Sequence, residues 1–173
     1  MKAVAAQASS GAYGPCRICA GIVPTADLTL GAAVEPVLQA HIAASPNLRG
    51  IRGPYTAGGD AKFAEAMALF EKYGLVFDLG ATFDKLHEAI EIARSFPAVT
   101  MVLNHCGELA GPSSFDGNPA AEEKWRADII ELGKLENVYA KVGGCTMTYN
   151  GWGFEDRDVP IGSEELAELT FPL

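Results

Sequence analysis

The sequence has no apolar run near the length of about 20 residues that a membrane span requires. It is also short of positive charge, because 13 Lys and Arg residues stand against 22 Asp and Glu residues and leave a net charge of −9. A surface of that sign repels phosphate backbones and anionic lipid. We therefore expect no nucleic-acid partner and no membrane partner. The apolar part of the first residues is too short for a signal sequence, which by default predicts a cytoplasmic protein.

Cysteine is sparse, and only one pair is close in sequence. Cys16 and Cys19 form a CxxC motif, a pattern that holds zinc or carries out redox chemistry in other proteins. A structural zinc site needs a second ligand pair of similar spacing, and the sequence has none. A redox CxxC opens a helix, whereas this one leads into a predicted strand. We expect Cys16 and Cys19 to bind no metal, and Cys106 and Cys145 to be free thiols.

The chain does have a regular alternation of strand-like and helix-like segments. Of its 173 residues, 49% are hydrophobic and 20% are charged, which indicates one globular domain over residues 1–173. Strands are expected at residues 18–23, 48–52, 75–79, 99–104 and 138–142, and helices at residues 32–44, 61–73, 83–96, 120–135 and from 163 onward. Such alternation predicts a parallel sheet, either an open doubly wound sheet or a (β/α) barrel.

Two features favour the barrel. The glycine-rich phosphate-binding motifs of open sheets, GxGxxG and GxxxxGK[ST], are missing, and glycines instead follow the predicted strands. Polar residues also end several strands, as they do at the mouth of a barrel. A complete barrel takes about 250 residues. We therefore predict an α/β fold that is an incomplete (β/α)8 TIM barrel of about five parallel βα units.

The segment 99–107 is the most informative stretch. A mostly apolar strand ends abruptly on Asn104, His105, Cys106 and Gly107. Polar side chains at the carboxyl end of a parallel strand lie where α/β enzymes place their sites. A histidine that ends an apolar strand also serves as a hydrogen-bonded structural residue in many proteins. The pattern leaves both roles open for His105.

Five segments together resemble the amidohydrolase-related family (amidohydrolase family 2), which comprises TIM-barrel metal-dependent hydrolases, lactonases and non-oxidative decarboxylases. In chain order they are residues 27–31, 48–52, 75–78, 102–107 and 138–144. Each block is weak alone, but their common order and spacing cover most of the chain. The resemblance implies that the predicted strands correspond to barrel strands three to seven.

The resemblance also implies roles for individual residues. His105 matches the catalytic histidine that ends the sixth strand and faces substrate or metal. Arg52 matches an arginine at the end of the fourth strand and is expected to bind a substrate carboxylate or carbonyl. Asn104, where relatives often have Asp, and Lys141 on the seventh strand are expected substrate-binding residues. For Lys141 a buried ion pair is an equal alternative.

Two further predictions concern neighbouring positions. Asp78 is expected to be structural and to cap a nearby turn. Trp152 and Phe154 fall in a loop that covers substrate in the family, although aromatic loop residues also pack on one another.

The departures from the family pattern are informative as well. The family's first strand carries His-x-His, and its eighth ends on an Asp that acts as general base. This sequence has no His-x-His, because its histidines are at positions 41, 87 and 105. The predicted strands also include no eighth strand to supply the Asp. His41 and His87 fall within predicted helices. Metal-assisted hydrolysis needs several fixed ligands, so we expect no metal site from these residues alone, and a divalent ion (Zn or Mn) only in an intact family site. The chain is thus interpreted as an internal piece of a longer enzyme.

The resemblance implies hydrolysis of a lactone, ester or amide bond of a small organic substrate by water activation at the barrel mouth. Three alternatives stay open: metal-dependent non-oxidative decarboxylation of an aromatic acid, a non-catalytic α/β fragment, and a binding module. The chain alone is expected to be inactive. Because an unclosed barrel leaves unpaired strand edges, self-association into a homo-oligomer is also expected.

Overall fold

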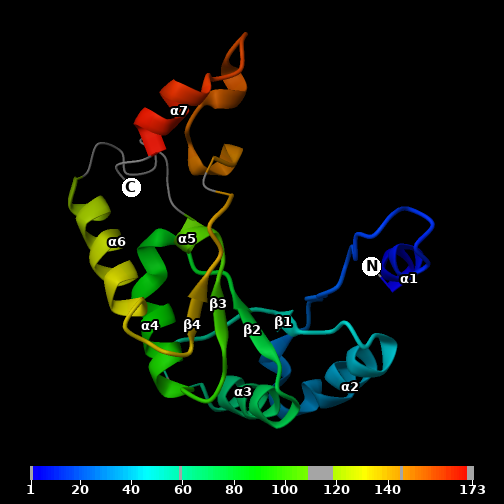
Figure 1. The fold of residues 1–173 in the computed structure, drawn as a ribbon. Helices are drawn as coiled ribbons and strands as arrows, with labels where there is room; N and C mark the ends of the chain where they lie inside the picture. Colours follow the sequence, from blue (N-terminus) through cyan, green and yellow to red (C-terminus); the bar gives the residue numbers. More distant parts are fainter. Residues whose placement is uncertain (1, 59, 109–118, 145, 171–173) are drawn as a thin grey trace.

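The computed structural model describes residues 2–58, 60–108, 119–144 and 146–170. Its centre is a parallel sheet in which the strands lie side by side in the order β1-β2-β3-β4 (Figure 1). The strands of the sheet are β1 (Gly50–Arg52), β2 (Val76–Leu79), β3 (Met101–Leu103) and β4 (Val138–Ala140). The predicted α/β fold with parallel strands in sequence order is confirmed for these four strands.

Helices connect the strands, as the alternating pattern predicts. The α-helices are α1 (Lys2–Ser9), α2 (Glu35–Ala44), α3 (Ala61–Tyr73), α4 (Leu86–Ser95), α5 (His105–Glu108), α6 (Pro119–Leu132) and α7 (Ser163–Thr170). Short 3-10 helices are η1 (Leu28–Val34), η2 (Phe83–Lys85), η3 (Thr148–Asn150) and η4 (Phe154–Asp156). None of the helices in the described part of the chain is long and apolar enough to cross a membrane.

The predicted strand at residues 18–23 is wrong as a continuous strand. Only two isolated parallel bridges stand in its place, from Ile22 to Leu48 and from Thr25 to Arg52. Pro24, which lies between the two bridges, has no N–H group to donate to a ladder. The segment therefore lies along β1 as an irregular edge; Cys16 precedes it in irregular structure, and Cys19 lies in a turn at its start.

The best-defined helix boundaries are those with explicit cap residues. Asp60 caps α3, because its Oδ1 accepts hydrogen bonds from the backbone N–H groups of Lys62 and Phe63 at 2.8 and 3.4 Å. Gly74 ends the same helix, as predicted. The helix expected at residues 32–44 instead begins as η1 and becomes α-helical only at Glu35, after a sharp backbone kink at Gly31.

The hydrophobic core lies between one face of the sheet and the helices. Phe77 of β2 is fully buried and meets the rings of Phe63 and Phe70 from α3 edge-on, at centroid distances of 5.9 and 5.6 Å. Ile51 and Met101 occupy the same register on the neighbouring strands and are equally buried. Helices α4 and α6 pack next to each other farther along the sheet (Figure 1). One face of the sheet is thus covered by packed helices.

The opposite face of the sheet is open. Arg52, Asp78, Val102 and Tyr139 share one row of the register, so their side chains project to the same side. Tyr139 is 62% exposed and Val102 is half-buried, whereas a closed barrel would bury such positions. This face carries the polar residues described in the next subsection.

The core position of Phe77 leads to a stability prediction. Replacing Phe77 with Ala leaves a cavity against two other rings, so the free energy of unfolding should fall by about 3–5 kcal/mol. Val142→Ala is the matched control, because Val142 is 91% exposed and its loss should change little. Urea denaturation followed by circular dichroism measures both variants. Equal effects of the two substitutions would contradict the core assignment.

Candidate functional site

Asp78 is a buried carboxylate held between two cations. Its side chain is only 3% exposed, at the register position next to Arg52. Arg52 donates to Oδ2 from Nε at 2.9 Å, and its Nη2 lies 2.8 Å from the same oxygen in the ion pair. Lys141 donates to the other oxygen, Oδ1, from Nζ at 2.6 Å. Both carboxylate oxygens are therefore occupied by charged donors, which compensates the cost of burying the charge.

Asn104 also bridges Arg52 and Lys141. Its Oδ1 accepts hydrogen bonds from Arg52 Nη2 at 3.0 Å and from Lys141 Nζ at 2.7 Å. The residue is 2% exposed and directly follows β3. Arg52, Asp78, Asn104 and Lys141, here called the Asp78 cluster, thus come from all four strands at their carboxyl ends.

The Asp78 cluster carries more positive than negative charge. Two cations and one carboxylate leave a surplus of one positive charge beside the neutral amide of Asn104. The side chains of Arg52 and Lys141 remain 48% and 41% exposed, so both cations are in contact with solvent as well as with Asp78. Such an arrangement can attract an anionic group or stabilise negative charge that develops on a carbonyl oxygen.

A hollow of about 580 Å³ adjoins the cluster at the ends of β1 and β2. Among the residues that line it are Thr25, Arg52, Tyr55, Thr82, Lys85 and Glu88. The volume is within the usual range of small-molecule pockets. Arg52 is the member of the Asp78 cluster that reaches this hollow.

Tyr55 is a neutral hydrogen-bond donor in this hollow. Burial, followed by the negative charge of Glu88, raises the pKa of Tyr55 to about 12. The ordinary tyrosine pKa is about 10. At neutral pH the phenol therefore keeps its proton.

His105 lies beside the cluster but is held by other partners. Its imidazole Nδ1 lies 3.0 Å from the carbonyl oxygen of Gly143, just beyond β4. Among the described residues, the hydrogen bonds of the Asp78 cluster do not include this ring. The structure thus brings together three of the predicted site residues, Arg52, Asn104 and Lys141, and places His105 at the same edge of the sheet.

The backbone at His105 has an unusual conformation. Four successive residues have positive φ angles, 48° at His105, 54° at Cys106, 82° at Gly107 and 49° at Glu108. The left-handed region costs roughly 1–2 kcal/mol for each residue with a Cβ atom. Such strain persists only where surrounding contacts enforce it, and it is concentrated at functional sites. We call residues 105–108, which make up α5, the left-handed turn.

Trp152 occupies the segment that follows β4. It stacks on Phe154 with ring centroids 5.5 Å apart and planes 26° apart. Figure 1 shows that this segment extends beyond the end of β4 and leads to α7. Packing of the two aromatic rings on each other, one of the two expected roles, is present. Contact of Trp152 with substrate stays a prediction.

The role predicted for Asp78 needs correction. Its carboxylate does not cap a turn but binds Arg52 and Lys141 across the sheet. A signal for this is present in the sequence, since an ionisable residue inside an apolar strand requires a charged partner. For Lys141, the ion-pair alternative is present, and a contact with substrate stays a prediction.

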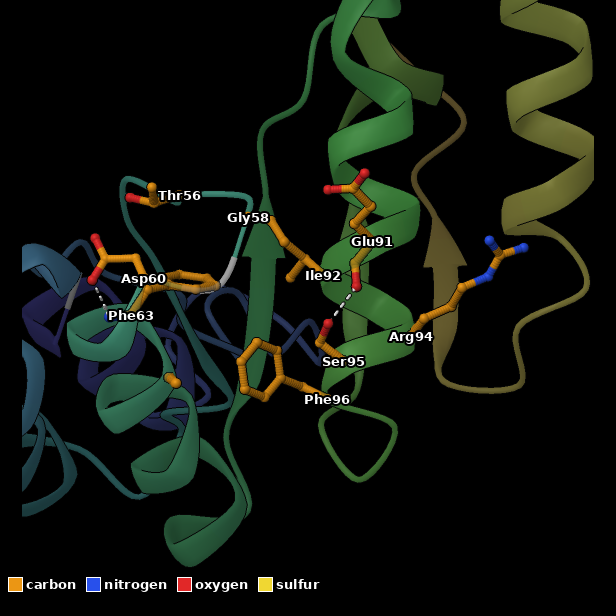
Figure 2. A pocket seen from close by; sticks show the side chains of 10 residues that line it. Thr56, Gly58, Asp60, Phe63, Glu91, Ile92, Arg94, Ser95 and Phe96 are labelled. Carbon is orange, nitrogen blue, oxygen red and sulfur yellow. Dashed lines mark hydrogen bonds between the residues drawn. The ribbon is translucent and has the colours of Figure 1, made fainter.

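A second hollow lies in the helix layer. It measures about 390 Å³ and is lined by residues of α3 and α4 and the loop before α3 (Figure 2). Three of its polar groups are engaged in bonds within the fold. Asp60 caps α3, the Ser95 hydroxyl donates to the Glu91 carbonyl at 2.8 Å, and Arg94 pairs with Glu131 at 3.1 Å. These bonds give Asp60, the Ser95 hydroxyl and Arg94 partners within the fold.

The described residues do not form a metal site. Within residues 2–58, 60–108, 119–144 and 146–170, no three His, Cys, Asp or Glu side chains are close enough to hold an ion. The two carboxylate oxygens of Asp78 already bind cationic side chains.

The family model named Amidohydrolase matches residues 18–172. The chain belongs to this family. In Burkholderia multivorans, an amidohydrolase crystallised with bound zinc has a similar fold, with a TM-score of 0.58 and 27% identity over 74% of this chain and 45% of that chain. A crystal form with bound HEPES gives a TM-score of 0.64 at 23% identity over 83% and 49%. This second likeness shows the fold alone.

One curated relative also matches. It is "Uncharacterized protein y4mH" of Sinorhizobium fredii, which is 36% identical over 83 residues, 47% of this chain and 26% of the relative. The chain thus spans about a quarter of that relative and just under half of the solved amidohydrolases. The family resemblance inferred from five sequence blocks is confirmed by the match to the family model.

The Asp78 cluster should contribute to stability. Asp78→Ala removes the shared partner of two cations, and we expect a loss of about 3 kcal/mol, the lower end for breaking a buried pair, because both cations reach solvent. Asp158→Ala is the matched control at an exposed position and should change stability little. Urea denaturation compares both with the parent chain. A loss at Asp78 no larger than that at Asp158 would refute the compensating role of the ion pairs.

The pKa of Tyr55 can be tested spectroscopically. A tyrosinate absorbance step near pH 12 should disappear in Tyr55→Phe and persist in Tyr13→Phe, which removes an exposed tyrosine. Because the fold favours the protonated phenol, this contribution to stability is complete below about pH 10 and is lost as the pH rises toward 12. A Tyr55→Phe variant that keeps the absorbance step near pH 12 would show that another group causes this step.

Proposed function

We propose that this chain forms the substrate-binding edge of an amidohydrolase-family hydrolase that cleaves a lactone, ester or amide bond of a small organic molecule. The observation that carries the proposal is the surplus positive charge of the Asp78 cluster next to a hollow of ligand size. Family membership supports the reaction class. The substrate itself is proposed to carry a carbonyl or carboxylate oxygen that Arg52 binds.

The chemistry follows from where negative charge appears. In hydrolysis, a general base of the intact family site takes a proton from water as the water oxygen adds to the carbonyl carbon, and the carbonyl oxygen becomes an oxyanion. The C–O or C–N bond then breaks and the proton passes to the departing oxygen or nitrogen, which gives an acid and an alcohol or amine, or a single hydroxy acid from a lactone. Half of the Arg52 side chain remains exposed, and its guanidinium is oriented by Asp78 and Asn104. Preorganised donors of this kind stabilise the oxyanion without reorganising during the reaction. His105 is proposed as a second stabilising group.

The neighbouring residues support an oxygen-rich ligand. Tyr55 keeps its proton, which a hydrogen bond to Glu88 engages, and Lys85 adds a second positive charge to the hollow. Glu88 sets a limit on where an anionic group can lie, because like charges repel. An anionic or carbonyl group is therefore expected at the Arg52 side of the hollow.

The experiment measures ligand binding and turnover by the purified chain. A panel of lactones, aryl esters and aryl amides, together with the hydroxy acids that the lactones release, is titrated by calorimetry. Arg52→Gln should weaken binding by about tenfold or more, as expected for loss of a charge-assisted hydrogen bond. Arg49→Gln is the matched control, because the hydrogen bonds of Arg49 within the described residues go to the nearby carbonyls of Pro46 and Leu48.

The outcomes test the proposed site. We expect binding without multiple turnovers by the chain alone. Multiple turnovers that vanish in His105→Ala would also support the hydrolase and would mean that the chain assembles its own complete site. A panel in which no member binds, or in which Arg52→Gln and Arg49→Gln bind equally well, would overturn the proposed site.

A further inference from the structure

Three hydrogen bonds hold the left-handed turn. The first closes the turn, from Gly107 N–H to the carbonyl of the preceding Asn104 at 2.8 Å. A second bond runs from Cys106 N–H to the Lys141 carbonyl on the neighbouring strand at 3.2 Å. The third comes from a side chain, because the Trp125 indole Nε1–H donates to the Cys106 carbonyl at 3.0 Å.

Trp125 is suited to fix this turn. It lies on α6, is only 5% exposed and belongs to the hydrophobic core. A buried indole has few alternative positions, so its N–H group is a fixed point against which the Cys106 carbonyl is set. Gly107 lies close to another buried side chain, since a Cβ atom there would come within 2.7 Å of Leu86. The turn is thus packed on the helix layer on one side and bonded to β4 on the other.

The orientation of the turn decides where the His105 ring lies. Its Nδ1 is 3.0 Å from the Gly143 carbonyl, and a carbonyl oxygen can only accept a hydrogen bond. Nδ1 therefore carries the proton of the neutral imidazole, and the lone pair is on Nε2. Gly144 lies directly under the ring, because a Cβ atom at its φ of 68° would be 2.3 Å from Nδ1.

We propose that Trp125 and Gly144 are positioning residues for His105. Trp125 acts through the Cys106 carbonyl and fixes the left-handed turn. Gly144 allows the imidazole to approach the backbone, so that the ring is held in one orientation and as the Nδ1–H tautomer. Nε2 is then the nitrogen presented to a ligand. This last step rests on the proposed function of His105, whereas the restraint of the ring does not.

The test reads the ring nitrogens directly. Long-range ¹⁵N–¹H spectra of the uniformly labelled chain are recorded at about pH 8, above the usual histidine pKa of about 6.5. His105 should show two well-separated ring nitrogens of the Nδ1–H tautomer, and His105→Gln identifies its signals among the three histidines. Trp125→Phe keeps the ring packing and removes the donor, so the two His105 shifts should move toward each other as the tautomers exchange.

Two further variants keep the proposal falsifiable. Gly144→Ala should displace the ring from the other side and should produce the same loss of tautomer separation. Leu132→Ala is the matched control, because Leu132 is 3% exposed on the same helix, α6, and its loss destabilises the core without removing a bond to the turn. It should leave the His105 signals unchanged.

The outcomes also distinguish this inference from the proposed function. An Nε2–H tautomer in the parent chain, or unchanged His105 signals in both Trp125→Phe and Gly144→Ala, would overturn the positioning roles. Equal changes in Leu132→Ala would assign them to general loosening and would overturn them too. A restrained Nδ1–H ring in a chain that binds no member of the ligand panel would refute the proposed function and leave the positioning roles standing.

Discussion

The buried carboxylate of Asp78 is the constraint on which the carboxyl edge of this sheet depends. A charge that is 3% exposed must be compensated, and here the compensation comes from β1 and from the residue after β4. Arg52 and Lys141 reach it from opposite sides, and Asn104 joins the same two cations above β3. One anion thereby sets the relative positions of side chains from four neighbouring strands. Removing it would leave two cations facing each other across β2 and β3.

The same arrangement explains why this edge is suited to bind a ligand. A buried ion pair contributes little net stability compared with apolar packing, because desolvation offsets much of the attraction. Two half-exposed cations around one carboxylate are different, because they retain charge and donor groups toward solvent. The carboxylate orients the donors, and the surplus charge remains available to a ligand. The bonds that compensate the buried charge therefore also fix the exposed donor groups at this edge of the sheet.

Sequence pattern predicts the parts of this structure that follow from hydrophobic periodicity. The four strands and the helices between them are found close to their expected positions, and α3 has the predicted bounds of 61–73, set by the Asp60 cap and by Gly74. The apolar run of residues 18–23 predicts a strand, but Pro24, which follows it, has no N–H group to donate to a strand ladder. The family resemblance predicts Arg52, Asn104 and Lys141 as site residues. Their dependence on Asp78 was missed, because the pairing of side chains across strands is a property of the register.

The left-handed turn lies beyond what periodicity can predict. Only one of its four residues is glycine, so nothing in the letters His-Cys-Gly-Glu marks positive φ angles at His105 and Glu108. The conformation results from tertiary bonds to Lys141 and Trp125, which are distant in sequence.

The open face of the sheet affects the charges of the residues above it. Solvent contact weakens every charge interaction of the Asp78 cluster, because a high dielectric screens the charges. Covering that face would strengthen the attraction of Arg52 and Lys141 for an anionic group, with no change in the residues that make it.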